Sequence, residues 1–589
     1  MRTITASLSG LLLSAFLLLP ASVQAAELQP FFTLKTSSIN TLVSVAEKVA
    51  GMADAANEAG FREFVNTVKN IKGVNSNGII GFAAAVDDAG SINMILLLPI
   101  TDLWGAEVPG FPDIFDSIRP FLVKKDGGKF EINSPLGAYV AVQKQGYLVI
   151  TPESAADSVP ADPTKLFADL EKFTLGMKLD LEKVEFETIE GNLFGPLLLM
   201  AMMNDPAMGE QLEGMVEIYR ELYNEFAVIS GGTVFNPRTA DLEMSVTMVP
   251  RKGSQFAKLL AGYKQQPTIF GGFRGTPATT VFSFGDSATQ PKIEDNAMLK
   301  ASIQQWESML EGFREQIAME DETGELSELA EEAAALILKI LETESKKGVS
   351  DVALSMNVDG IVLGASDTAS LVEIQKLAAM VAAFAADKVP DEAKALLAKN
   401  LNLGYATVEG FKISSVKIPV VATLELFIGP APDDTMNDLT LGVFWGVKEG
   451  NKQAIAVAAG LDFAKAEQAF KAALTQTKTA VPVQKPDGVF SIAGLGKFLQ
   501  QTVYPIAAKA AERDGQSSQQ ELAVFRKVNE IFTSAGNDAT ITINSNIKSD
   551  RMEMGYHVSG KVIQAIISAV KLGAEEANPF MQRPIIQDF

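Results

Sequence analysis

The sequence predicts an internally duplicated α+β fold, in which antiparallel sheets carry amphipathic helices packed on one face. Three observations lead to this prediction. An order of strand, two helices, hairpin and helix recurs four times along the chain. Two glycine-bounded hairpins of similar sequence lie between the copies. Apolar residues make up 47% of the chain and charged residues 21%, which is a composition that builds a core. Hairpins that alternate with helices favour antiparallel sheets with helices on one face.

The first 25 residues predict a cleavable secretory signal peptide. Arg2 supplies a positive start, residues 8–19 form an uncharged apolar run that Pro20 ends, and Val23 and Ala25 precede the cleavage point. The run is shorter than the roughly 20 residues that span a bilayer, which favours cleavage over a membrane anchor. We therefore expect a periplasmic or extracellular protein without a transmembrane span in the mature chain.

The first predicted half, residues 26–266, contains two copies of the recurring unit. Apolar side chains such as Ile39, Leu42, Val43 and Ala46 recur at helical spacing after Ser38. The first copy comprises a strand at 31–35, helices from 38 and at 61–71, a hairpin of 79–86 with 92–98, and a helix near 114–122. The second comprises an alternating strand at 179–186, helices at 194–203 and 212–226, a hairpin of 227–235 with 242–249, and a helix around 256–260.

The second predicted half, residues 267–589, follows the same plan. The dipeptide Asp359-Gly360 is typical of a tight hairpin turn. The third copy comprises a strand at 279–284, helices at 299–319 and 326–344, a hairpin of 352–358 with 361–365, and a helix at 371–386. The fourth comprises a strand at 489–492, helices at 498–511 and 522–532, a hairpin of 540–547 with 552–558, and a helix at 562–570.

Two further hairpins suggest that the halves arose by duplication. Residues 137–150 lie between the first two copies, and residues 442–457 lie between the last two; each reads as a strand, a turn and a second strand. The seam is placed near residues 265–267. The alternative is chance similarity among amphipathic elements.

Composition excludes several classes of function. The formal charge of −22 disfavours nucleic acid, because an acidic protein repels a phosphate backbone. The absence of cysteine excludes disulfides, thiol nucleophiles and thiolate metal sites. The single histidine, His557, cannot build a multi-histidine metal site, and we interpret it as a cross-strand or surface residue rather than a general base. The sequence thus predicts no catalytic residue, cofactor or metal.

Three short motifs each have a functional and a plainer structural interpretation. Residues 494–497 lack the first glycine and the Ser or Thr of a phosphate loop, which favours a strand-to-helix turn. The glycine-rich residues 271–277, with Arg274, suggest either an anion site or, preferably, a linker between the halves. The cluster from Asp433 to Asp438 offers oxygen ligands for a weak calcium site, but it lacks the calcium-loop glycine and glutamate, so a solvated acidic loop is preferred.

A methionine-rich segment is the most site-like feature of the sequence. Met200, Met202 and Met203 lie on one predicted helix, where flexible thioethers suit either ordinary core packing or the lining of a hydrophobic-ligand site. The general pattern resembles large exported bacterial proteins of unknown function that carry a signal segment and repeated strand–helix modules. That resemblance implies no catalytic residues.

Three functions remain open from the sequence. The first is an exported, non-catalytic binding or scaffold protein of the cell envelope, whose partner is an unknown protein or hydrophobic ligand. The second is a carrier of a hydrophobic ligand such as a lipid. The third is a carboxylate-based hydrolase of envelope polymers, which requires two carboxylates that face each other across a cleft.

Overall fold

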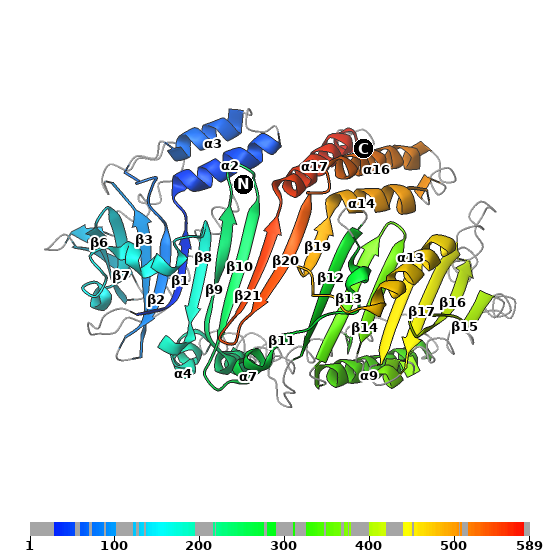
Figure 1. Ribbon diagram of the computed structural model, residues 1–589. Helices are drawn as coiled ribbons and strands as arrows, with labels where there is room; N and C mark the ends of the chain where they lie inside the picture. Colours follow the sequence, from blue (N-terminus) through cyan, green and yellow to red (C-terminus); the bar gives the residue numbers. More distant parts are fainter. Residues whose placement is uncertain are drawn as a thin grey trace. The chain divides into compact units, whose positions relative to one another are not determined.

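The computed structural model describes the chain between residues 29 and 581 (Figure 1). Within this span it leaves out residues 54–58, 70–72, 88–89, 102–121, 125–128, 135–136, 195–215, 218, 276–279, 290–309, 312–324, 347–348, 367–369, 375, 378–399, 420–439, 450–452, 506 and 509–515. The predicted signal peptide, the methionine-rich segment and the acidic cluster at 433–438 lie outside the described residues.

The chain divides into two compact units. Unit 1 contains residues 1–257 and 550–555, and unit 2 contains residues 258–549 and 556–589. The predicted halves meet at residues 266 and 267. No helix among the described residues combines the length and apolar character needed to cross a membrane.

Unit 1 is built on an antiparallel sheet in which neighbouring strands follow the order β4, β5, β6, β7, β3, β2, β1, β8, β9, β10. The hairpin β6–β7 confirms the pair of strands predicted within 137–150. The strand bounds are β1 Pro30–Thr36, β2 Gly81–Val86, β3 Ile92–Pro99, β4 Leu122–Lys124, β5 Lys129–Ser134, β6 Gly137–Lys144, β7 Tyr147–Pro152, β8 Leu175–Asp180, β9 Phe226–Phe235 and β10 Leu242–Pro250.

Unit 2 repeats this connectivity, with the strand order β15, β16, β17, β18, β14, β13, β12, β19, β20. The short strand β11 also pairs with β12. The strand bounds are β11 Lys264–Gln265, β12 Thr280–Thr289, β13 Val349–Asn357, β14 Gly360–Ser366, β15 Leu401–Val408, β16 Phe411–Pro419, β17 Thr440–Lys448, β18 Ala454–Gly460, β19 Gly488–Ser491 and β20 Thr540–Ile547. The last strand, β21 (Met552–Val558), has residues 552–555 in unit 1 and residues 556–558 in unit 2.

The helices follow local signals that the sequence carries. Ser38 caps α2 by accepting a hydrogen bond from the Thr41 amide, and Asp462 caps α13 in the same way through the Lys465 amide. The α-helix bounds are α2 Ile39–Met52, α3 Ala59–Lys69, α4 Phe186–Ile189, α7 Gln255–Gly262, α9 Glu325–Lys346, α13 Phe463–Thr475, α14 Ile492–Phe498, α16 Gln516–Ser534 and α17 Gly560–Met581. Short 3₁₀ helices include η5 (Pro163–Leu170) and η8 (Gly271–Arg274).

The predicted fold class is wrong. In each unit the described strands form an antiparallel sheet, and the structure is dominated by these sheets rather than by helices layered on one face. In unit 1, α2 and α3 lie at one end of the strands and α4 at the other (Figure 1). The prediction failed because β1, the first strand of unit 1, pairs with β8 as well as with β2, and β12 pairs with β19 as well as with β13. Without β8 and β19, the strands β1 and β12 would be open sheet edges, and open edges pair readily.

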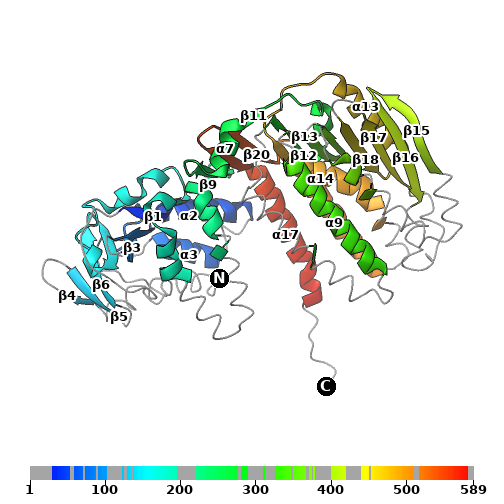
Figure 2. The ribbon, with the colours of Figure 1, turned by 90° about the horizontal axis from the view of Figure 1, so that it is seen from below.

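Helices that the prediction placed over a sheet also pack on one another. Helix α14 contacts α16, α16 contacts α17, and α2 contacts α3. In unit 2, α13 lies across β17 and β18 on one side of the sheet, whereas Figure 2 shows α9 on the other side. An amphipathic pattern specifies that a helix has an apolar stripe, but it does not specify which surface covers that stripe.

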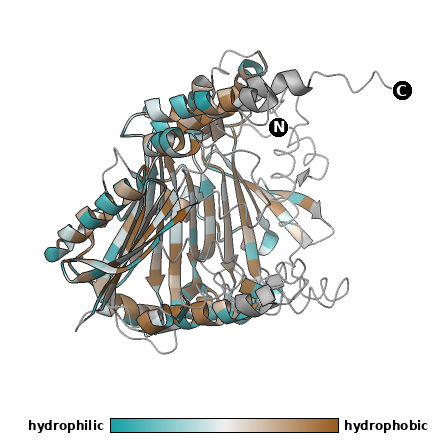
Figure 3. Cartoon of the chain, turned by 90° about the vertical axis from the view of Figure 1, so that its right-hand side faces the viewer, coloured by the Kyte–Doolittle hydropathy of each residue, from teal (hydrophilic) through white to brown (hydrophobic). Residues whose placement is uncertain are grey.

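The core is divided between the two faces of the sheet, and Figure 3 shows hydrophobic residues along the strands and mixed colouring on the helices. In unit 2, one cluster brings Phe411 and Phe444 of the sheet against Phe470 of α13 and Phe270 beside η8. Gly364 of β14 permits this packing, because a Cβ there would lie 2.3 Å from Cδ1 of Phe270. A second cluster joins Ile492, Ala539, Val562 and Ala565 beneath the last helices.

Most predicted strands of the four copies are confirmed, and one is displaced. The hairpins β2–β3, β9–β10 and β13–β14 lie where their turn residues indicated. The strand predicted at 179–186 instead ends at Asp180, and a 3₁₀ helix from Leu181 to Lys183 follows it. The apolar alternation in the sequence extends beyond the strand, because the short helical turns after Asp180 also bury every second or third residue. This is why the alternation predicted a strand there.

Candidate functional site: two apolar rows on the sheet

The sheet of unit 1 has one covered face and one half-exposed face. Along β1, Phe31, Thr33 and Lys35 are buried, whereas Phe32 and Leu34 are half-buried. The covered face lies beneath η5. Phe167 of η5 occupies the space above Gly81, where a Cβ would lie 2.4 Å from Cζ of the ring. Lys35 donates to the carbonyl of Glu171 at 3.1 Å, and burial lowers the pKa of this lysine.

The half-exposed face of unit 1 carries a continuous line of apolar residues that are direct neighbours across six strands. We call this line the unit 1 row: Leu96, Phe82, Leu34, Met177, Gly231 and Val246. Met177 is 42% exposed, and its strand neighbour Leu175 is 45% exposed. Beyond Leu96 the line continues into the buried residue Ile150, so the row is closed at one end and accessible in the middle.

The lines on either side of the unit 1 row are also uncharged. One contains Met94, Ala84, Phe32, Leu179, Ile229 and Met248. The other contains Thr36, Leu175, Thr233 and Met244. The three lines contain no ionisable side chain, in a chain in which 21% of all residues are charged. Met94 and Ala84 are buried, and Phe82, Leu96, Phe32 and Leu179 pack against a buried cluster, so the accessible part of the face is centred on β8.

Unit 2 has a corresponding line on the face opposite α13. We call it the unit 2 row: Trp445, Val457, Leu363, Leu354 and Phe284. Leu363 is 37% exposed, and Ile361 on the same strand and face is 45% exposed. On β18 the alternation is complete, because Ala454, Ala456 and Ala458 are buried while Ile455 and Val457 are half-buried.

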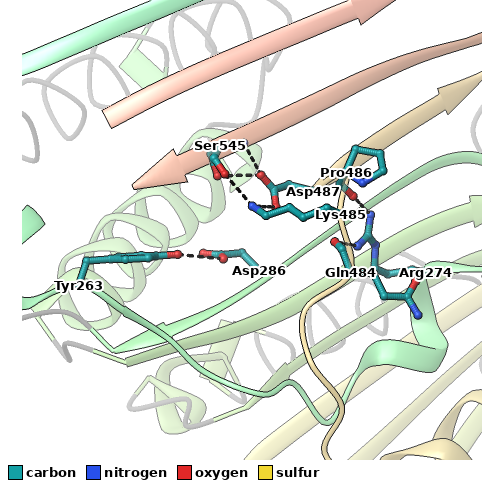
Figure 4. Close-up of polar contacts among 8 residues, drawn as sticks. All are labelled: Tyr263, Arg274, Asp286, Gln484, Lys485, Pro486, Asp487 and Ser545. Carbon is teal, nitrogen blue, oxygen red and sulfur yellow. Dashed lines mark hydrogen bonds and ion pairs between the residues drawn. The ribbon is translucent and has the colours of Figure 1, made fainter. Parts of the chain in front are cut away.

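A polar cluster lies beside the unit 2 row (Figure 4). Asp286 follows Phe284 by two residues on β12, and its carboxylate accepts from the Tyr263 hydroxyl at 3.4 Å. Burial, with a further contribution from the nearby Asp487 carboxylate, raises the pKa of Asp286. Burial also raises the pKa of Tyr263, and the same two carboxylates add to this effect. The protonated form of Asp286 is therefore favoured more than in an ordinary exposed aspartate.

The second carboxylate of the cluster, Asp487, is occupied by structural contacts. It accepts from the Ser545 hydroxyl at 2.7 Å and forms an ion pair with Lys485, and its side chain is 5% exposed. Arg274 of η8 donates to the carbonyls of Gln484 and Pro486. These contacts hold the segment before β19 against β12 and β20, and they leave Asp487 no free face toward an open cleft.

Several residues singled out in the sequence have other roles in the structure. Arg274 is buried against the 484–486 backbone, so the preferred linker interpretation is wrong: Phe273 of the same segment is 1% exposed and belongs to the core. Gly494 and Gly496 lie inside α14 rather than in a turn. They are glycines because close packing on the Thr280 carbonyl and on α16 leaves no room for a side chain. His557 is half-buried on β21.

The described residues contain no group of three or more acidic, histidine or cysteine side chains that could hold a metal ion. The predicted ligand lining at Met200, Met202 and Met203 lies outside the described residues, and the structure directs attention to the sheet faces instead. Both rows were missed because each joins strands far apart in sequence. The only local signal of the rows is that residues such as Leu354 and Val457 are the apolar members of alternating strands, and this does not show whether they stay exposed.

Comparison with protein-family models, with curated proteins and with solved structures found no match.

Proposed function

We propose that the protein is an exported, non-catalytic binding protein of the cell envelope that holds the acyl chain of a lipid against the unit 1 row. The observation that carries this proposal is the uncharged, half-exposed face on which Met177 and Leu175 are 42% and 45% exposed. Exposed apolar surface of this kind on a soluble protein marks a place where a ligand or partner binds.

The chemistry of the face favours an acyl chain. The backbone groups of β1, β2, β8 and β9 are engaged in sheet pairing, so the face offers side-chain contact but few free donors or acceptors. A ligand with polar groups would lose hydrogen bonds to water there without replacing them. A hydrocarbon chain has no such cost, and its burial contributes about 0.8 kcal/mol for each CH₂ group.

The same face is less suited to a protein partner. Protein interfaces combine an apolar centre with a polar rim and are rich in arginine. The unit 1 row and its two flanking lines contain no ionisable residue, so an apolar lipid chain complements the face better than a protein surface does.

A carboxylate-based hydrolase receives less support. The described chain does bring two carboxylates near each other, Asp286 and Asp487, but Asp487 is buried and committed to Ser545 and Lys485. A glycosidase needs both carboxyl groups free to face the substrate. Export rests on the predicted signal peptide at residues 1–25 and agrees with a role in the envelope, where lipids must be kept from water.

The proposal is tested by lipid content and by oleate binding. The full chain is expressed with its leader in a bacterial host and purified without detergent, and an organic extract is analysed by mass spectrometry. We expect acyl lipid in the extract. After delipidation, oleate should displace the fluorescent acyl probe cis-parinaric acid. An empty extract together with no oleate binding would refute the proposal.

A pair of variants tests the location. Met177→Gln places an amide against the chain and should weaken oleate binding about tenfold, which corresponds to about 1.4 kcal/mol. The matched control is Leu42→Gln on α2, because Leu42 is 37% exposed in the same unit but lies outside the row. Equal effects of the two substitutions would contradict a site at the row.

A further inference from the structure

We infer that the unit 2 row is a second acyl-chain site, so that one polypeptide holds two lipid chains. This inference rests on the proposed function of unit 1. It adds a separate site, a separate set of residues and a stoichiometry.

The two rows occupy matching places in the strand order. In unit 1 the lead strand β1 pairs with β2, and β2 pairs with β3; in unit 2, β12 pairs with β13, and β13 with β14. Leu34, Phe82 and Leu96 are therefore matched by Phe284, Leu354 and Leu363. Apolar side chains line the same part of the sheet in both units.

The unit 2 row is accessible on the side away from α13. Helix α13 and the 3₁₀ helix η8 cover Ala353, Phe444 and Ala456 on one face. On the other face Leu363 and Ile361 keep 37% and 45% of their surface exposed, with α9 lying on that side of the sheet (Figure 2). The most exposed residues lie on β14 in unit 2 and on β8 in unit 1. The two bound acyl chains would therefore be centred on different strands of their sheets.

The length and charge of the unit 2 row fit the same ligand. Neighbouring strands lie about 4.8 Å apart, so five strands carry an apolar line about 19 Å long. One flanking line, Phe282, Met356, Ile361, Ala459 and Val443, is uncharged. The other carries charge only at its ends, at Asp286 and Lys412, with Val352, Ala365, Ile455 and Val447 between them. An uncharged centre complements a hydrocarbon chain.

Native mass spectrometry of the full chain with oleate tests this inference. At an oleate concentration only a few times the wild-type dissociation constant, a site that is weakened about tenfold stays mostly empty. Under this condition we expect mainly two oleates on the wild-type protein, one on Leu363→Gln, one on Met177→Gln and none on the double variant. Val372→Gln is the matched control, because Val372 is 57% exposed in unit 2 but is not part of the sheet; it should retain two. Thermal melting of each variant checks that exposed-site substitutions leave the fold intact.

The outcomes separate the two proposals. A single oleate on the wild-type protein that Met177→Gln removes and Leu363→Gln leaves in place would overturn the second site and leave the proposed function standing. No oleate on the wild-type protein would overturn both. Two oleates that neither substitution removes would place the sites elsewhere and also overturn the inference.

Discussion

Replacing Phe444 by alanine tests the assignment of the two faces of unit 2. Phe444 is fully buried, and its ring centroid lies 4.8 Å from that of Phe463 and 6.1 Å from that of Phe470. Its strand neighbour Val443 points to the opposite, half-exposed face. The two positions therefore differ in what surrounds them and not in their place along β17.

The expected cost follows from the packing. Removing a fully buried phenylalanine side chain leaves a cavity and lowers the free energy of unfolding by about 3–5 kcal/mol. The aromatic contacts with Phe463 and Phe470 place Phe444→Ala in the upper part of that range, because edge and tilted ring pairs add about 0.5–1.5 kcal/mol. Val443→Ala removes half-exposed methyl groups and should cost less than about 1.5 kcal/mol.

Urea unfolding followed by far-ultraviolet circular dichroism measures both variants. Tryptophan fluorescence, to which Trp445 next to Phe444 is one of three contributors, gives a second signal. If Val443→Ala proved as costly as Phe444→Ala, or if Phe444→Ala cost less than about 1 kcal/mol, the face assignment on which the unit 2 row depends would be wrong.

Two further predictions concern a titrating acid and a turn. Because the pKa of Asp286 is raised above its unfolded value, ionisation weakens the folded state as pH rises through the folded pKa; Asp286→Asn should therefore stabilise the protein at about pH 7 and change little below about pH 3.9. A urea midpoint for Asp286→Asn that is unchanged at neutral pH would contradict this. Gly360 has φ +139°, and a Cβ there would lie 2.1 Å from the Ala459 carbonyl oxygen, so Gly360→Val should lower the free energy of unfolding by more than about 1 kcal/mol. An unaltered melting temperature for Gly360→Val would show that the β13–β14 turn does not need glycine.

Local elements could be predicted where one short segment carries the whole signal. The strands β20 and β21 have the predicted bounds, and α2 begins directly after its predicted start at Ser38. By contrast, the hairpin β15–β16 and the helix α13 were not predicted, although Asp462 is an ordinary N-cap. In these segments small and mixed residues blur the helical and strand periods, so tertiary contacts decide the outcome.

The candidate site was less predictable than the elements that form it. Leu34 and Met177 are neighbours only because β1 pairs with β8, and Phe284 meets Leu354 only through the register of β12 with β13. Asp286 was also missed, and its local signal is that it is an acid on the apolar side of an alternating strand. Its contact with Tyr263 and its proximity to Asp487 depend on segments from three parts of the chain.

The sequence by itself determined the strand alternation, the hairpin turns, the helix caps and the acidic, cysteine-free composition, because each depends on neighbouring residues or on a simple count. Only the tertiary structure decided that β1 pairs with β8 and β12 with β19 within the sheet of each unit, which helices cover which face, and which apolar residues stay half-exposed. Edge pairing and burial are settled by competition among distant segments for the same hydrogen bonds and the same apolar surface, and no local pattern records the result of that competition.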